Sequence, residues 1–149
     1  MPLKPLYNTD IDKTLKHISY YYKCIPKDFL NDIKVNPKSS FCCVLNLQNS
    51  NERGSHWVCL FVDKTKHFIE YFDSFGIPPI KNVVSFCKRN YPNRELFYQD
   101  NQLQMFSSVL CGYFCIYYIQ NRFEGKSPYE TLYSLKQEPS LSNELLIVE

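Results

Sequence analysis

Residues 56–73 read HWVCLFVDKTKHFIEYFD, two apolar runs separated by the polar residues DKTK. Two such runs, rich in aromatic residues and joined by a short polar loop, predict a β-hairpin. If Val62 pairs with His67, then His56 lies opposite Asp73 at the open end of the hairpin, where the Cβ atoms of cross-strand partners are about 5 Å apart. The hairpin therefore predicts that an imidazole and a carboxylate meet on one face of a sheet.

The flanking segments predict the rest of the sheet and its helices. Residues 24–30 are expected to be irregular and extended, and the last ten residues weakly ordered. Apolar spacing predicts strands over residues 41–47 and 95–99 and helices over residues 8–22, 111–123 and 127–135. It also predicts a helix whose apolar positions run from residue 80 to residue 87, with Pro78 and Pro79 in its first turn. We therefore expect a single α+β domain over residues 1–149, in which a helix leads into a mixed or antiparallel sheet.

The composition excludes several classes of protein. Hydrophobic residues make up 44% and charged residues 21% of the 149 residues, which is ordinary globular usage. A net charge of +2 is too small to make nucleic acid the default partner. The longest apolar run, residues 109–119, is shorter than the roughly 20 residues that span a bilayer, and residues 1–13 do not resemble a signal peptide. We expect no membrane partner.

The seven cysteines lack the paired CxxC spacing of a structural zinc site, so no metal site is predicted. Most of them lie inside apolar runs such as FCCVL, WVCLF and GYFCIYY. This placement is typical of reduced, buried thiols and indicates an intracellular, reducing compartment.

One cysteine has the surroundings of a nucleophile. Cys111 opens the helix predicted over residues 111–123, and a helix N-terminus favours the thiolate. His56 supplies a general base, and Asp73 can hold its tautomer by accepting a hydrogen bond. Gln104 lies seven residues before Cys111 and offers an amide donor to a developing oxyanion, together with the Cys111 backbone N–H.

Several of these assignments have an alternative. Cys111 taken alone is more often a small core residue, and Trp57 is as readily a packing residue as a substrate contact. Asp63 competes for the role of the acid, although the hairpin places it at the far loop. Gln102 competes with Gln104 for the role of the oxyanion donor.

Three segments together resemble a known group of proteases. Residues 104–115, QMFSSVLCGYFC, resemble the nucleophile region of the adenovirus endopeptidase, adenain, and of the related SUMO-deconjugating cysteine proteases. His56-Trp57 resembles their His-Trp pair, and residues 72–76, FDSFG, resemble their acidic residue with its downstream aromatic and glycine. The order His, acid, Gln, Cys is the same. The resemblance covers roughly residues 8–133 and implies a fold that is circularly permuted relative to papain.

The resemblance implies a role for each matching residue. Cys111 corresponds to the nucleophile, His56 to the general base and Asp73 to the orienting acid. Gln104 corresponds to the oxyanion-hole glutamine. Trp57 corresponds to the aromatic residue that, in the SUMO proteases, walls a narrow channel for a Gly-Gly substrate.

The resemblance also implies a function. We expect a monomeric cysteine endopeptidase from a virus or a virus-like mobile element, acting in the virion and in the host nucleus or cytoplasm. Capsid or core precursors cleaved after small residues such as Gly are the expected substrates. The alternatives are an isopeptidase that removes a ubiquitin-like modifier and, outside enzymes, an inactive binding module of the same fold.

Adenain uses DNA and a viral peptide as cofactors. In this chain no acidic residue occurs between residues 74 and 94, and the basic residues there are Lys81, Lys88, Arg89 and Arg94. A solvated helix face is the plainer explanation of these residues, and a surface that tracks DNA is the alternative. Adenain links its peptide through a cysteine between its acid and its glutamine. Here Cys87 occupies that interval but lies on an apolar helix stripe, so any peptide activation is expected not to need a disulfide.

Overall fold

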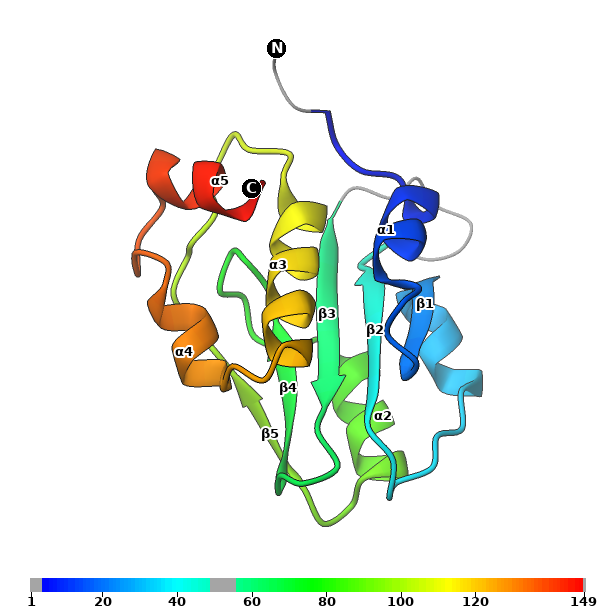
Figure 1. The fold of residues 1–149 in the computed structure, drawn as a ribbon. Helices are drawn as coiled ribbons and strands as arrows, with labels where there is room; N and C mark the ends of the chain where they lie inside the picture. Colours follow the sequence, from blue (N-terminus) through cyan, green and yellow to red (C-terminus); the bar gives the residue numbers. More distant parts are fainter. Residues whose placement is uncertain (1–3, 49–55, 149) are drawn as a thin grey trace.

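The computed structural model of the chain describes residues 4–48 and 56–148. Its strands form one sheet in which spatial order follows sequence order (Figure 1). The strands are β1 (Tyr21–Pro26), β2 (Phe41–Asn46), β3 (Trp57–Val62), β4 (Phe68–Phe72) and β5 (Glu95–Tyr98). Strands β2, β3 and β4 are antiparallel, whereas the edge strands β1 and β5 run parallel to their neighbours. The sheet is therefore mixed and the fold is α+β, as predicted.

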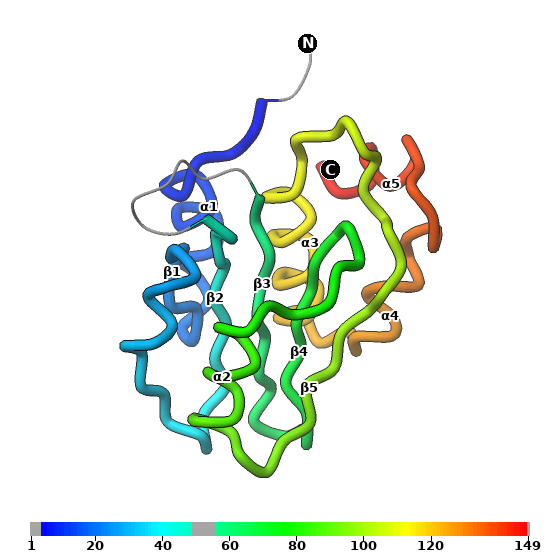
Figure 2. Tube along the Cα trace, turned by 180° about the vertical axis from the view of Figure 1, so that it is seen from behind, coloured from blue at the N-terminus to red at the C-terminus, as the bar shows by residue number. Residues whose placement is uncertain are grey.

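Helices cover both faces of this sheet (Figures 1 and 2). The helical elements are α1 (Asn8–Leu15), the 3₁₀ helix η1 (Lys27–Asp32), α2 (Lys81–Asn90), α3 (Cys111–Phe123), α4 (Pro128–Tyr133) and α5 (Leu141–Ile147). Elements η1 and α2 lie in the connections between parallel strands, because a parallel pair needs a crossover. Both pack on one face, and α1 and α3 pack on the other. Within the described ranges, no helix is long and apolar enough to cross a membrane.

The continuous apolar sequence of β2 is explained by the burial of both faces of the sheet. Successive side chains of a strand point to opposite faces. Cys42 and Val44 pack in the core beneath α1 and α3, whereas Cys43 and Leu45 pack in the core beneath η1 and α2. Because both faces of the strand are buried, apolar residues occur at every position. All seven cysteines of the chain are free and buried.

Two predicted helix boundaries are wrong. Helix α1 ends at Leu15 rather than continuing to residue 22, and Tyr21 already pairs with Cys42 in the sheet. The apolar spacing nevertheless predicted burial correctly for Ile18. Helix α2 begins at Lys81, so the two prolines precede its first turn, where they favour extended backbone.

The prediction of a weakly ordered C-terminus is also wrong, because residues 141–147 form α5. The Ser140 hydroxyl caps this helix by accepting a hydrogen bond from Asn143 N at 3.2 Å. The Asn143 amide donates to the backbone carbonyl oxygens of Leu103, Lys136 and Glu138 at 2.9–3.1 Å. These contacts with earlier segments order the helix.

The predicted hairpin forms, but in a different register. The prediction pairs Leu60 with Ile69, whereas the structure pairs Leu60 with Tyr71. The connecting loop extends over residues 63–67 and is longer than the four residues expected. A shift of two residues keeps every side chain on its predicted face, whereas a shift of one would have reversed the faces. His56 and Asp73 therefore share a face as diagonal neighbours rather than as directly opposed partners.

Candidate active site

The candidate nucleophile, Cys111, is the first residue of α3. Its side chain is 5% exposed, and its Sγ accepts a hydrogen bond from Trp57 N at 3.4 Å. The N-cap residue Leu110 makes no side-chain capping hydrogen bond. The backbone N–H groups at the start of α3 therefore lie beside the thiol, where they stabilise negative charge.

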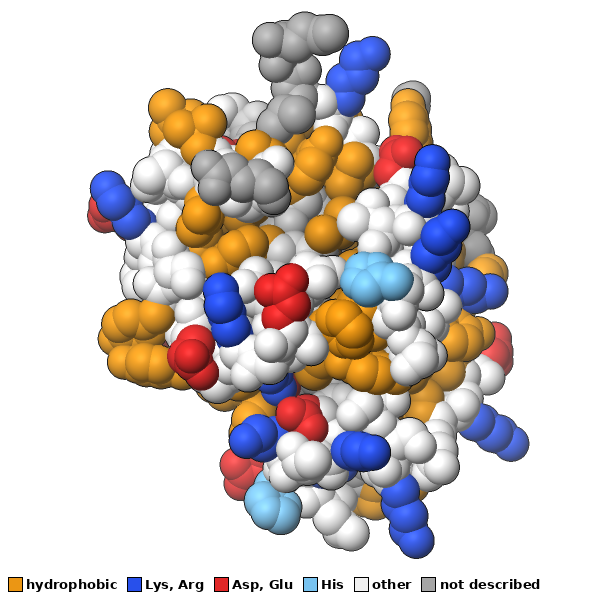
Figure 3. All heavy atoms as spheres, viewed as in Figure 1, with side chains coloured by type: hydrophobic (Ala, Val, Ile, Leu, Met, Phe, Trp, Pro, Cys, Tyr) orange, Lys and Arg blue, Asp and Glu red, His pale blue; other side chains and the backbone are white. Residues whose placement is uncertain are grey.

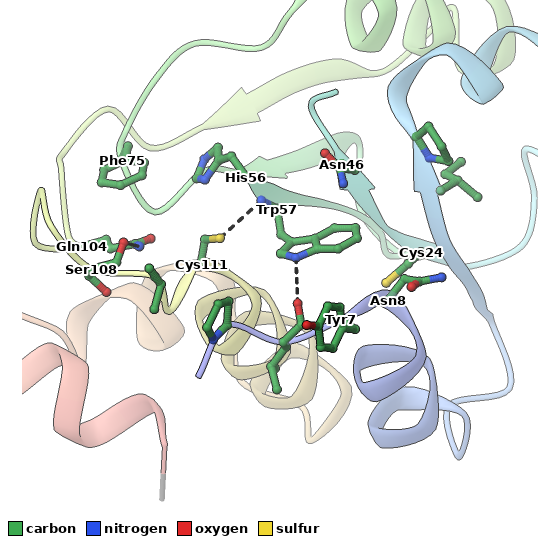
Figure 4. A pocket seen from close by; sticks show the side chains of 15 residues that line it. Tyr7, Asn8, Cys24, Asn46, His56, Trp57, Phe75, Gln104, Ser108 and Cys111 are labelled. Atoms are coloured by element: carbon green, nitrogen blue, oxygen red, sulfur yellow. Dashed lines mark hydrogen bonds between the residues drawn. The ribbon is translucent and has the colours of Figure 1, made fainter. Parts of the chain in front are cut away.

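The candidate base and acid are in direct contact. His56 Nε2 donates to Asp73 Oδ1 at 2.9 Å, which leaves the second ring nitrogen for the thiol of Cys111. Figure 4 shows the His56 ring near the Cys111 side chain among the residues that line the cavity. Asp73 is 1% exposed, and its Oδ1 also accepts a hydrogen bond from Phe75 N at 2.8 Å. Gln99 Nε2 donates to the Asp73 backbone oxygen at 2.8 Å, so hydrogen bonds hold both the carboxylate and the backbone of the acid.

These contacts determine the charge of His56. Burial on its own lowers the pKa of the imidazole, but hydrogen bonds and charge interactions with Asp73 and Cys111 outweigh it and raise that pKa to about 9. His56 is therefore an imidazolium at neutral pH, as a thiolate–imidazolium pair requires.

A pH profile tests this pair. Because the charged form of His56 persists to about pH 9, kcat/KM should fall above that pH as the ring loses its proton. Asp73→Asn removes the negative charge that raises this pKa, so its alkaline limb should move to lower pH. Asp63→Asn, at the far end of the hairpin, serves as the control and should keep the limb near its original position. An unmoved limb in Asp73→Asn would contradict the assignment.

The candidate oxyanion donor is fixed at both ends of its amide. Ser74 Oγ donates to Gln104 Oε1 at 2.5 Å, and Gln104 Nε2 donates to the Ser108 backbone oxygen at 2.9 Å. A primary amide carries two N–H donors, so one remains for a developing oxyanion. The alternative donor, Gln102, instead donates to the backbone oxygen of Gln104 at 3.0 Å. Gln104 lines the cavity of Cys111, which favours it over Gln102.

We expect Gln104→Ala to lower kcat by about 10²-fold or more, since one oxyanion donor contributes about 3 kcal/mol in comparable sites. KM should change little, because the hydrogen bond strengthens only in the transition state. Steady-state kinetics on a peptide substrate measure both values, with Gln102→Ala as the matched control. A loss confined to KM, or an equal loss in Gln102→Ala, would remove Gln104 from this role.

These side chains open into a cavity of about 590 Å³. Trp57 forms one wall, and its Nε1 donates to the backbone oxygen of Leu6 at 3.3 Å (Figure 4). The cavity is lined by Pro5, Leu6, Tyr7, Asn8, Cys24, Ile25, Pro26, Asn46, His56, Trp57, Phe75, Gln104, Ser108, Val109 and Cys111. Cys111, His56, Gln104 and Trp57 thus line one cavity, and the buried Asp73, which does not line it, is hydrogen-bonded to His56.

Two further residues, Phe75 and Ser74, contribute to the site and were not predicted to do so from the sequence. Phe75 packs against His56 with ring centroids 5.0 Å apart, and Ser74 orients Gln104. Both lie in the FDSFG motif directly after the acid, so the motif itself was the available signal. No local pattern indicated that residues 5–8 line the cavity.

The structure separates the competing acid from the site. Asp63 follows β3 at the closed end of the hairpin, where its Oδ1 accepts hydrogen bonds from Thr65. Its other carboxylate oxygen lies 3.5 Å from Arg122 Nη2. Asp73 rather than Asp63 therefore contacts His56.

The four basic residues of the predicted DNA surface differ in their contacts. Arg89 Nη2 donates to the Leu30 backbone oxygen at 2.8 Å, and Arg94 Nη1 donates to the Asp63 backbone oxygen at 2.9 Å. Lys81 and Lys88 are exposed on α2. Two of the four side chains thus already bind backbone oxygens of this chain, and DNA binding stays a prediction.

Cys87 is a poor candidate for a disulfide-linked peptide. Its side chain is 5% exposed on α2. Burial raises the pKa of this thiol to about 12, which disfavours the thiolate needed for disulfide exchange.

A second hollow, of about 340 Å³, lies between α4 and the strands β4 and β5. Tyr129 and Tyr133 of α4 line it, stack with ring centroids 4.1 Å apart and are mostly exposed. Figure 3 shows hydrophobic side chains gathered over α4. This hollow presents apolar contact area, whereas the catalytic groups line the first cavity.

No family model matches the chain. The chain is 32% identical over 101 residues to the SUMO-1 cysteine protease of African swine fever virus, a match that covers 61% of this chain and 37% of that protein. A relative from another strain, described as a cysteine protease, matches equally well. The chain therefore spans less than two fifths of the length of these curated relatives.

Solved structures show the same fold. The African swine fever virus protease superposes with a TM-score of 0.74 at 22% identity, covering 97% of this chain and 66% of that chain. The SUMO protease Ulp1 superposes with a TM-score of 0.57 at 14% identity, covering 98% and 74%. The central domain of an uncharacterised Legionella pneumophila protein gives 0.55 at 13% identity, covering 98% and 94%. The chain is thus similar in sequence to the viral cysteine protease and shares its fold and that of Ulp1, which confirms the predicted resemblance to the SUMO-deconjugating proteases.

Proposed function

We propose that this chain is a cysteine endopeptidase with Cys111 as its nucleophile. The observation that carries the proposal is that Cys111, His56 and Gln104, from three separate segments, line one cavity, with the buried Asp73 hydrogen-bonded to His56. The names of the curated relatives support the same chemistry. An inactive binding module has no need for this complete set, so the enzyme is the better interpretation.

The geometry supports a two-stage reaction. The Cys111 thiolate attacks the scissile carbonyl carbon, and the resulting oxyanion accepts hydrogen bonds from Gln104 Nε2 and the Cys111 backbone N–H. The His56 imidazolium gives its proton to the leaving amine, which departs and leaves a thioester on Cys111. Neutral His56 then takes a proton from water as the water attacks the thioester. Collapse of this second intermediate breaks the C–S bond, which regenerates the Cys111 thiolate and releases the carboxylic acid. Asp73 keeps the ring oriented throughout.

We propose substrates with a small residue, such as Gly, before the scissile bond. Trp57 and residues 5–8 line the cavity next to Cys111, and Trp57 Nε1 is joined to the Leu6 backbone oxygen by a hydrogen bond of 3.3 Å. We expect walls joined in this way to disfavour a bulky side chain beside the nucleophile. The viral source of the matched relatives supports capsid or core precursors as substrates. The description of one relative as a SUMO-1 protease and the Ulp1 fold favour a second candidate, the release of a ubiquitin-like modifier.

The test offers the purified chain three substrates: a peptide library with Gly-Gly before the scissile bond, a ubiquitin-like precursor, and a lysine-linked modifier conjugate. Cleavage of peptides after Gly, absent in Cys111→Ala, supports the endopeptidase. Cleavage confined to the two modifier substrates would replace it with the isopeptidase. If none of the three is cleaved, the proposed function is wrong.

A further inference from the structure

A buried carboxylate of the C-terminal helix contacts the loop that precedes the nucleophile. Glu144 of α5 is 6% exposed, although its carboxylate belongs to a residue type that is seldom buried without partners. It accepts a hydrogen bond from the Ser108 hydroxyl and a second from Met105 N, the latter at 3.3 Å. Both partners lie in the segment between Gln104 and Cys111.

Ser108 connects this carboxylate to both halves of the oxyanion hole. Its backbone oxygen accepts the hydrogen bond from Gln104 Nε2 at 2.9 Å. Its hydroxyl oxygen accepts a hydrogen bond from Leu110 N at 3.1 Å, and Leu110 is the residue directly before Cys111. One serine thus contacts the amide donor on one side and the start of α3 on the other.

We propose that Glu144 is a positioning residue for the oxyanion hole, acting through Ser108. The inference rests on the proposed function, since it assigns a role within that same site. Glu144 does not line the cavity, so it does not touch the substrate.

The direction of the hydrogen bonds explains how Glu144 acts. Because the Ser108 hydroxyl donates its proton to the carboxylate, its oxygen lone pairs remain for Leu110 N. The Met105 contact holds the other end of the loop, whose tip, Phe106, is 92% exposed and so receives little support from packing. Without the carboxylate, the hydroxyl can rotate and the loop loses two attachments. Gln104 and the Cys111 N–H would then lie less accurately, and displacements of about 1 Å cost roughly 10²-fold in rate.

The position of α5 does not depend on Glu144 alone. Asn143 binds three backbone oxygens of earlier segments, and Ile147 is buried in the core. The carboxylate of Glu144 can therefore be removed while the helix keeps its place. Glu138, an exposed residue of the same region, supplies a matched control.

The test compares Glu144→Ala, Glu144→Gln, Ser108→Ala and the control Glu138→Gln by two measurements. The first is kcat and KM on a peptide that the wild-type chain cleaves. The second is the rate at which iodoacetamide alkylates Cys111, a substitution that forms no oxyanion and so does not use the oxyanion hole.

We expect Glu144→Ala to lower kcat by about 10- to 100-fold, with KM and the alkylation rate within about twofold of wild type. Glu144→Gln should lose less than Glu144→Ala, because its amide oxygen still accepts a hydrogen bond from one of the two partners, although its NH2 group cannot accept the other. The losses in Glu144→Ala and Ser108→Ala should not add in the double variant, since the two residues act as one unit. Glu138→Gln should match wild type.

An unchanged kcat in Glu144→Ala would overturn the inference and leave the proposed function intact. An equal fall of kcat and alkylation rate would also overturn it, because it would indicate a general loosening of the fold. A wild-type chain that is alkylated but cleaves no substrate would remove the proposed function, and the inference with it.

Discussion

Cys111→Ala is expected to lower kcat/KM on a cleavable peptide by at least about three powers of ten, because the variant lacks the thiol that lies beside His56 and Gln104 and forms the thioester. The fold should survive, since the change removes one sulfur atom and its hydrogen bond from Trp57 N. Peptide cleavage assays and thermal unfolding measure the two effects separately.

Cys24→Ala is the matched control for this variant. Cys24 lines the same cavity and is also buried, but burial raises the pKa of its thiol well above the ordinary value, so it is a poor nucleophile. Its loss should leave most of the activity. Near wild-type cleavage by Cys111→Ala would show that the nucleophile lies elsewhere.

His56→Ala is expected to approach the loss seen in Cys111→Ala, because without the imidazole nothing protonates the leaving amine. Asp73→Ala should cost less, since the acid orients and charges the base but transfers no proton itself. The ranking is measured by kcat/KM at a pH below the alkaline limb.

Asp63→Ala tests the assignment of the acid. Asp63 lies in the loop at the closed end of the hairpin, away from His56, so its removal should leave kcat/KM close to wild type. Equal losses in Asp63→Ala and Asp73→Ala would mean that the contact between His56 and Asp73 is not the functional one.

The sequence predicted the parts of the fold that depend on local patterns. Apolar runs and helical spacing located the strands from β2 to β5 and the start of α3 at Cys111. The contact between His56 and Asp73 was predicted from a hairpin whose register was wrong by two residues. The contact survived because an even shift preserves the faces and a diagonal pair is still within reach of long side chains.

Long-range contacts account for what the sequence did not predict. Gln104 is oriented by Ser74, thirty residues earlier in the chain. Glu144 reaches Ser108 across thirty-six residues, and α5 is ordered by similar contacts. Neither the spacing nor the composition of residues 140–149 indicates these partners, so the segment looked weakly ordered in isolation.

Covalent labelling with a Gly-Gly peptide vinyl sulfone, followed by peptide mapping in a mass spectrometer, tests most directly whether Cys111 is the nucleophile. We expect one adduct per chain, on Cys111, with cleavage lost in proportion to labelling. His56→Ala should slow the labelling, because it removes the imidazolium that stabilises the thiolate. An adduct on another cysteine such as Cys24, or cleavage that persists after Cys111 is fully labelled, would show that Cys111 is not the nucleophile.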